Sequence, residues 1–157
     1  MKLARTGCAV EEALQVLGER WTLLVLREAF FGLRRFEEFQ QKIGCARNLL
    51  TSRLATLVKS GVLARVPYRE EGQRERFEYL LTPRGKELYP LLQALRQWGD
   101  RWVYDGEGPL EVFHRECGGR VFSEVRCEHG HGPLPASETD AQLNRRFKRS
   151  AKARARR

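Results

Sequence analysis

Thiol and imidazole side chains gather near the C-terminal end of the chain at spacings that could hold a metal ion. The candidate ligands are His114, Cys117, Cys127, His129 and His131. Thiolates and imidazoles together favour Zn²⁺, which takes four such ligands in a closed tetrahedron. The nine-residue gap between Cys117 and Cys127 is shorter than in common zinc fingers, so a metal-free hairpin is the alternative. Structural zinc is the one cofactor that the sequence suggests, and no cofactor is required by it.

Residues for catalysis do not form a recognised pattern. The chain has no phosphate-binding glycine loop, no nucleophile-elbow sequence and no paired carboxylates with a plausible cleft. All three histidines lie beyond residue 113, which leaves the main domain without an obvious general base. We therefore predict that the protein is not an enzyme.

Nucleic-acid chemistry is offered by one stretch, residues 44–61, which predicts a helix bounded by two glycines. One face is apolar, with Leu50, Leu54, Leu57 and Val58. The other carries short polar and cationic side chains without an acid, which suits base edges and phosphates in a major groove. We expect Arg47, Asn48, Thr51, Ser52 and Arg53 to approach bases and nearby phosphates. An ordinary surface helix is the alternative for this stretch taken alone.

The neighbouring segments favour DNA binding. Residues 8–18 and 20–31 predict two helices, and residues 35–43 predict a third, joined to the stretch by a tight turn at Gly44 and Cys45. We expect Cys45 to be a small buried residue. Residues 62–68 and 75–81 predict a β-hairpin, the wing of a winged helix-turn-helix. Backbone contacts are expected from Lys59, Arg69, Arg74 and Arg76, although the glutamates near the hairpin tip dilute that signal.

Thr82 and Pro83 predict the start of a long helix, kinked at Pro90. Its broad apolar face is formed by Leu88, Leu91, Leu92, Leu95, Trp98 and Trp102. So small a domain has little need for such a face. We therefore expect this helix and residues 8–18 to form a homodimer interface, with packing on the domain's own core as the alternative.

Composition and charge bound the remaining choices. The chain has 157 residues, 41% hydrophobic and 31% charged, and no apolar run approaches the roughly 20 residues needed to cross a bilayer. We expect a cytoplasmic protein without a membrane partner. Much of the net charge of +9 comes from residues 145–157, which hold Lys and Arg but no acid.

The expected fold class is α+β, mostly α, with dimerisation helices at both ends of a winged domain and a small zinc-ribbon-like hairpin. Its predicted parts are a DNA-binding and dimerisation domain at 1–104, a linker at 105–110, the hairpin at 111–134 and a disordered basic tail at 135–157.

The order of these elements resembles the HxlR-type winged helix-turn-helix transcriptional regulators, relatives of the MarR type. The likeness spans residues 8–102 and rests on ALQVLGERWTLLVLRE, RRFEEFQQKIG, ARNLLTSRLATLVKSGVLARVPY, RFEYLLTPRGKEL and LRQWGDRW. It implies a dimer with the helix from Asn48 to Ser60 in the major groove and the wing on the backbone or minor groove. It also implies a redox role for Cys8, whose thiolate would be favoured at a helix start; a plain interfacial thiol is the alternative. Ala9 stands where the family usually has proline, and the wing loop lacks the family's usual prolines.

These observations predict a sequence-specific regulator of transcription, of the repressor kind, that binds double-stranded DNA as a homodimer. An oxidant or a small-molecule effector would control it. The alternative is a winged-helix interaction, architectural or RNA-binding protein whose affinity comes mainly from the basic tail.

Overall fold

The computed structural model of the protein describes residues 8–72 and 74–142. Contacts between residues divide the chain into two units, Met1–Val121 and Phe122–Arg157. The basic segment at 145–157 lies outside the described residues. Over the part of the chain that is described, no helix is long and apolar enough to cross a membrane.

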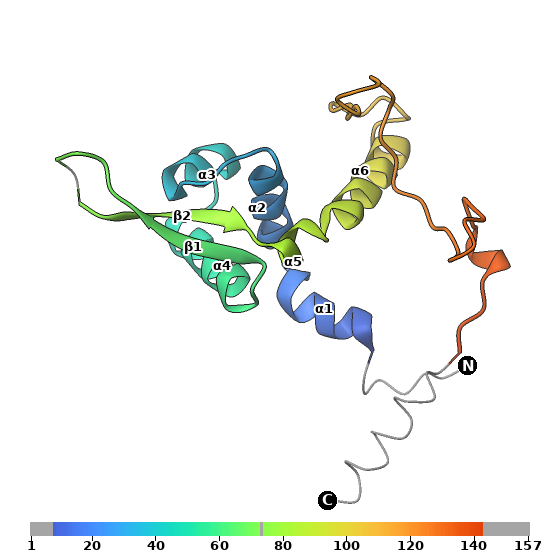
Figure 1. Ribbon diagram of the computed structural model, residues 1–157, viewed down its shortest axis with the longest axis horizontal. Coiled ribbons are helices and arrows are strands. Elements are labelled where there is room, and N and C mark those ends of the chain that lie inside the picture. Colours follow the sequence, from blue (N-terminus) through green and yellow to red (C-terminus); the bar gives the residue numbers. More distant parts are fainter. Residues whose placement is uncertain (1–7, 73, 143–157) are drawn as a thin grey trace, which may run out of the picture. The chain divides into compact units, whose positions relative to one another are not determined.

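The first unit begins with a run of helices, shown in blue to green in Figure 1. They are α1 (Ala9–Leu17), α2 (Arg20–Phe30), α3 (Phe36–Ile43) and α4 (Arg47–Lys59). The bounds agree with the predicted ones to within a few residues. Gly44 ends α3 at φ 71°, and Gly61 follows α4 at φ 73°. Both adopt the left-handed conformation, which glycine tolerates without strain.

The core of this unit lies between α2, α3 and α4. Val25 and Leu26 of α2, Phe39 of α3, and Leu50 and Leu54 of α4 have at most 1% of their surface exposed. Burial of one such side chain contributes about 1.5–3 kcal/mol to the free energy of unfolding. The apolar stripe predicted for α4 is confirmed, and its burial leaves the polar side of the helix facing solvent.

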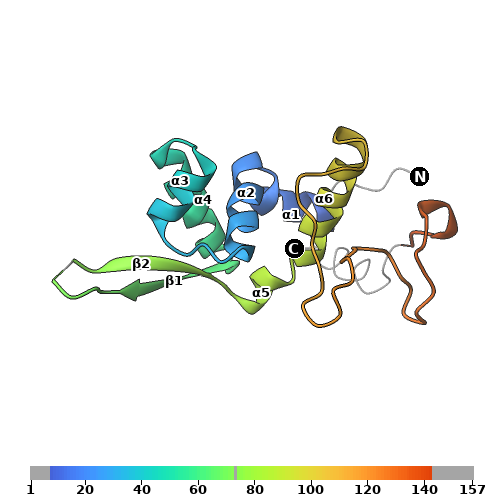
Figure 2. The same cartoon turned by 90° about the horizontal axis from the view of Figure 1, so that it is seen from above.

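A two-stranded antiparallel hairpin follows α4 and forms the wing. Its strands are β1 (Leu63–Tyr68) and β2 (Arg76–Leu81), with Leu63 opposite Leu81 and Tyr68 opposite Arg76. The hairpin runs along one side of α2, α3 and α4 (Figure 2). The segment before α3 adds a bridge between Arg35 and Glu78, next to a hydrogen bond from the backbone N–H of Tyr79 to the carbonyl of Arg34 at 2.7 Å.

The prediction of one long helix after the hairpin is wrong in one respect, because the segment forms two helices. Thr82 caps α5 (Pro83–Lys86) as predicted, since its hydroxyl accepts a hydrogen bond from the Gly85 N–H. The helix is then interrupted at Glu87 and Leu88. The next helix, α6 (Tyr89–Val103), has Pro90 in its first turn. Proline lacks an N–H and fits the first turn of a helix better than its interior, so Pro90 begins a helix instead of kinking one.

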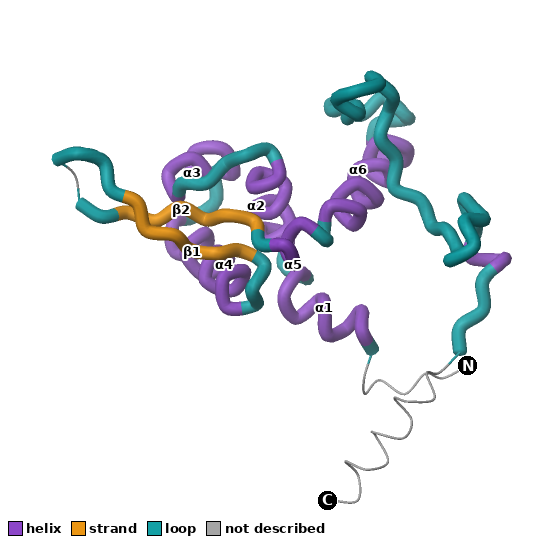
Figure 3. The backbone as a smooth tube through the Cα atoms, in the orientation of Figure 1, coloured by secondary structure: helices purple, strands orange, loops and turns teal. Residues whose placement is uncertain are grey.

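Residues after α6 fold back along that helix, although no strand or helix forms between 105 and 121 (Figure 3). Arg96 of α6 organises this return. Its guanidinium donates to the carboxylate of Asp100 at 2.5 Å and to the carbonyl of Leu110 at 3.2 Å. Where the sequence predicts a hairpin at 111–134, a single bridge forms between Phe113 and Arg120, and no strand.

The second unit contains a small closed loop. Leu134 donates its backbone N–H to the carbonyl of Val125 at 2.9 Å, and Cys127 donates to the carbonyl of His131 at 3.0 Å. Arg126 closes the loop further with a bond to the carbonyl of Gly130 at 2.9 Å. A short 3₁₀ helix (Ala136–Glu138) follows.

Candidate nucleic-acid interface

The turn between α3 and α4 sets the start of the recognition helix. Gln40 of α3 donates its side-chain amide to the carbonyl of Cys45 at 2.5 Å, and Gly44 supplies the left-handed residue. Cys45 is 4% exposed, so the prediction of a small buried residue is confirmed. The turn is therefore held on both sides before Arg47 opens α4.

The outer face of α4 carries most of the predicted contact residues. Arg47, Asn48, Thr51, Ser52 and Lys59 are all exposed. Two of them are held by local bonds: the Thr51 hydroxyl donates to the carbonyl of Arg47 at 2.8 Å, and the Asn48 Oδ1 accepts from the N–H of Leu49 at 2.9 Å. The Nδ2 group of Asn48 takes no part in that bond. The face thus presents two cations, an amide and two hydroxyls, which match base edges and phosphates.

Arg47 is oriented by an aromatic ring. Its guanidinium lies 4.7 Å from the centroid of the Phe36 ring at the start of α3. A cation over an aromatic face is favourable by about 0.5–1 kcal/mol at an exposed site, and the contact restricts the arginine rotamers. The first residue of α4 is therefore partly preorganised.

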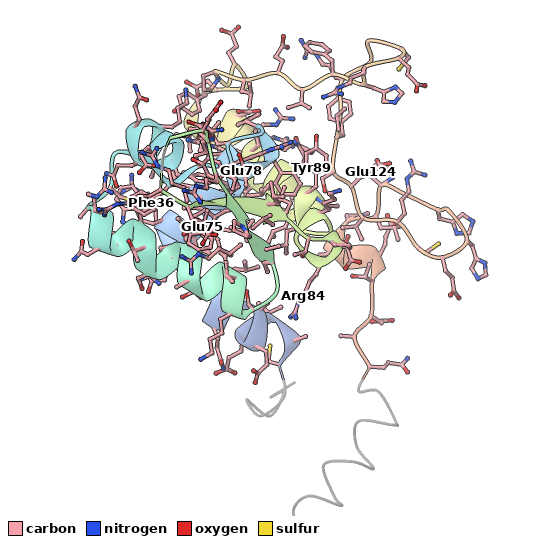
Figure 4. The ribbon with its side chains drawn as sticks, turned by 60° about the vertical axis from the view of Figure 1, so that its left-hand side comes forward. Phe36, Glu75, Glu78, Arg84, Tyr89 and Glu124 are labelled. Atoms are coloured by element: carbon pink, nitrogen blue, oxygen red, sulfur yellow. The ribbon has the colours of Figure 1, made fainter. Side chains whose placement is uncertain are left out.

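A shallow depression of about 340 Å³ joins the recognition helix to the wing. Its lining comes from α3, α4 and β2: Phe36, Glu37, Arg47, Thr51, Arg76, Phe77 and Tyr79. Phe36, labelled in Figure 4, lies where these elements meet. The tertiary structure thus brings Arg47 and Thr51 together with Arg76, which is distant in sequence. Two cations and a hydroxyl around one hollow can hold a phosphate of a DNA strand, with Glu37 opposing them.

The remaining predicted contact residues are placed differently. Arg69 and Arg74 are exposed near the hairpin tip. Arg53 instead turns towards α2, where its guanidinium lies 3.8 Å from the carboxylate of Glu19 and only 21% of its side chain is exposed.

Sequence reasoning missed two arginines that contact aromatic rings of the hairpin, one from β1 itself and one from the segment before α3. Arg65 of β1 places its guanidinium 3.4 Å from the centroid of the Phe77 ring, and Arg35 lies 4.6 Å from the centroid of the Tyr68 ring. Alternation in β1 could have indicated Arg65 as an outward residue. No local pattern indicated Arg35, because its partners lie more than thirty residues away in the sequence.

The start of α3 is capped by a carboxylate. Glu38 accepts hydrogen bonds from the backbone N–H groups of Arg35 and Arg34, both at 2.9 Å. These two bonds lower the pKa of Glu38 below its usual value, and the bond from Arg35 has the larger effect. The negative charge also suits the positive end of the helix dipole.

The cysteines and histidines give the zinc prediction no support. Within 8–72 and 74–142, no group of three or more His, Cys, Asp or Glu side chains is placed to hold a metal ion. The Nδ1 atom of His114 lies 3.2 Å from the Sγ atom of Cys117, which is a pair and not a closed site. All four cysteines are free thiols, and Cys8 is exposed at the N-cap of α1.

Apolar side chains remain exposed on α1 and on α6, although Leu88 and Leu92 of the predicted apolar face pack against the core. Leu95, Trp98 and Trp102 of α6 are 47%, 61% and 64% exposed, and Val10 and Leu14 of α1 are 66% and 56% exposed. Large exposed apolar patches are uncommon on monomeric soluble proteins.

A helix-turn-helix with a polar outer face, followed by a hairpin, defines a winged helix-turn-helix protein, a class that binds DNA. Residues 16–107 match the HxlR-like helix-turn-helix family, which covers more than half of the chain. The chain belongs to this family and is a transcriptional regulator of the helix-turn-helix type.

Three individual relatives support the assignment to helix-turn-helix transcriptional regulators. An uncharacterized HTH-type transcriptional regulator of Mycobacterium tuberculosis, Rv3095, is 44% identical over 78% of this chain and 77% of its own length. The crystal structure of PA1607, a candidate transcription factor, superposes with a TM-score of 0.77 at 39% identity, over 89% of this chain and 97% of that one. The reduced redox regulator HypR has a TM-score of 0.55 at 29% identity, over 62% of this chain and 98% of its own.

Proposed function

We propose that the protein is a homodimeric repressor that binds a specific DNA sequence, with α4 in the major groove and the hairpin on the flanking backbone or minor groove. The observation that carries this proposal is the outer face of α4, where Arg47, Asn48, Thr51 and Ser52 are exposed together without an acid. Coverage of a promoter is sufficient for repression, whereas activation requires a further surface for the polymerase. We place this activity in the cytoplasm.

The proposed dimer uses the apolar surface of α1 and α6. A two-fold dimer would present two copies of α4 to half-sites about 34–36 Å apart, one turn of DNA. The exposed tryptophans Trp98 and Trp102 support this arrangement, since aromatic side chains are enriched at the centres of interfaces.

Site selection from random DNA with the full-length protein tests the proposal. We expect one preferred sequence with two-fold symmetry. Asn48→Ala should cost about 1–3 kcal/mol and relax the preference at one or two base pairs. Lys59→Ala is the matched contrast on the same helix: it should weaken all sequences alike and lower the salt slope by about 1. If Asn48→Ala weakened binding to all DNA sequences equally, Asn48 would not be a residue that recognises bases.

The alternative function is nucleic-acid binding driven by the basic tail, which lies outside the described residues. Deletion of residues 145–157 separates the two. A specific repressor should keep its preferred site while its salt slope becomes shallower. A tail-driven binder would lose nearly all affinity and show no preferred site before or after deletion.

Control by oxidants is a second proposal, favoured by the exposed thiol of Cys8. The likeness to HypR, a redox regulator, adds support. Cys8 from each subunit would pair in a disulfide on oxidation. Non-reducing electrophoresis after mild peroxide treatment should show a covalent dimer that Cys8→Ser abolishes; an unchanged dimer in Cys8→Ser would reject the role. A small-molecule effector remains a further proposal without an assigned ligand.

A further inference from the structure

Acidic residues along the hairpin would weaken contacts between the wing and the DNA phosphates. Glu70, Glu71, Glu75 and Glu78 accompany the arginines of the wing. A carboxylate beside a phosphate is repelled by it, because both groups are negatively charged. The fold gives two of these glutamates another partner.

That partner is Arg35, in the segment between α2 and α3. Its Nη1 atom lies 2.9 Å from Oε1 of Glu70, and its Nε atom lies 3.4 Å from Oε1 of Glu78. The guanidinium also lies over the ring of Tyr68. One side chain therefore contacts the end of β1, the loop after it and the middle of β2.

The backbone reinforces this attachment at the same place. Arg35 and Glu78 form a bridge, and the N–H of Tyr79 donates to the carbonyl of Arg34 at 2.7 Å. The hairpin is thus attached to the start of the helix-turn-helix by a backbone bond with a three-partner side chain beside it. Glu78 is labelled on the hairpin in Figure 4.

The chemistry of these contacts requires arginine. A planar guanidinium can donate to two carboxylates in its plane while its face stacks on an aromatic ring. A lysine ammonium is a point charge and cannot do both. About 40% of the Arg35 side chain is exposed, so the value of the arrangement lies in geometry more than in stability.

We propose that Arg35 is a positioning residue for the wing: it fixes the angle of the hairpin relative to α4 and holds Glu70 and Glu78 away from DNA. The exposed Arg69, Arg74 and Arg76 can then meet the backbone on either side of the bases read by α4. The proposal rests on the proposed DNA-binding function, but the attachment of the hairpin can be measured without DNA.

The test compares Arg35→Gln and Arg35→Lys with Arg34→Gln in the full-length protein. Arg34→Gln removes the same charge one residue away and leaves the contacts of Arg35 in place. Two readouts are used: hydrogen exchange of the Tyr79 amide by NMR, and hydroxyl-radical footprints on the selected DNA. The Val62 amide, bonded to the carbonyl of Leu57 at 2.9 Å, reports on global stability.

We expect both Arg35 variants to speed Tyr79 exchange by about tenfold or more while Val62 exchange changes little. Protection should be lost at the flanks of the footprint and kept at its centre, with affinity lower by roughly tenfold. Arg34→Gln should leave Tyr79 exchange and flank protection unchanged. Glu78→Gln should have a partial effect that is not additive with Arg35→Gln, because both act through one contact.

The proposal is overturned if Arg35→Lys restores the wild-type footprint and Tyr79 exchange, since a charge alone would then suffice. Equal acceleration of Tyr79 and Val62 would also reject it, because that result indicates general destabilisation. Should wild-type protein select no DNA sequence, the proposed function fails, while the exchange of Tyr79 still decides whether Arg35 holds the hairpin.

Discussion

The guanidinium of Arg53, in the middle of the recognition helix, lies 3.8 Å from the carboxylate of Glu19, the N-cap residue of α2. The Nε atom of Arg53 is buried without a hydrogen-bond partner in the described chain. The contact joins α4 to the junction between α1 and α2, so the helix proposed to read DNA is tied to a helix proposed to form the dimer.

Arg53→Ala is therefore expected to act on the placement of α4 and not on base recognition. Loss of its buried methylene groups should lower the free energy of unfolding by about 1 kcal/mol. Glu19→Gln should cost less than about 0.5 kcal/mol, because the carboxylate is 61% exposed and such ion pairs contribute little. Thermal unfolding and site selection measure both effects. A changed base preference in Arg53→Ala would show that Arg53 reads DNA directly.

Trp98→Ser should convert a dimer to a monomer at micromolar concentration. Removal of a large aromatic group from the middle of the proposed interface is expected to cost about 2 kcal/mol or more of association. Sedimentation velocity measures the change. Phe31→Ser is the matched control, since Phe31 is 54% exposed but follows α2, outside the α1 and α6 surface; dissociation in this control and not in Trp98→Ser would place the interface elsewhere.

Glu38→Gln should destabilise the protein by about 0.5 kcal/mol at pH 7, a small value because the carboxylate is mostly exposed. The pKa of Glu38 is lowered in the folded state, so its contribution is present above the unfolded pKa of about 4.3 and is lost as the pH falls through the folded pKa. The difference between the two proteins in urea unfolding should hold from pH 6 to 8 and shrink below about pH 4. Glu37→Gln, which removes a neighbouring charge but no cap, should show a smaller effect; an equal effect would assign it to the helix dipole alone.

Gly85→Ala should be strongly destabilising. A Cβ atom at this buried position in α5 would meet the backbone carbonyl oxygen of Val62 at 2.2 Å, and neither backbone can yield easily. We expect a loss of about 2–4 kcal/mol in denaturant unfolding. Gly99→Ala is the control: a Cβ atom there meets nothing within 4 Å, so alanine should stabilise α6 by about 0.5–1 kcal/mol. Similar losses for both would contradict the steric argument.

Much of the fold could be predicted from periodicity and breakers. The apolar spacing in 44–61 and its two glycines predict α4, and the hairpin predicted at 62–68 and 75–81 contains β1 and β2. The break between α5 and α6 was missed, because a proline inside a helical pattern is compatible with either a kink or a new start. The hairpin predicted at 111–134 forms one bridge and no strand, because short β-branched runs do not show whether a partner continues alongside.

The sequence by itself determined which side chains α4 exposes, since helical periodicity places Asn48, Thr51 and Ser52 opposite the leucines that form the core. It also determined the family, through the order and spacing of its motifs. Only the tertiary structure decided which distant residues support that face. Arg76 joins Arg47 at one hollow, Arg35 holds the hairpin through Glu70 and Glu78, and Arg53 turns inward to Glu19. Local propensity cannot specify such pairs, because they depend on the angles at which separate elements pack.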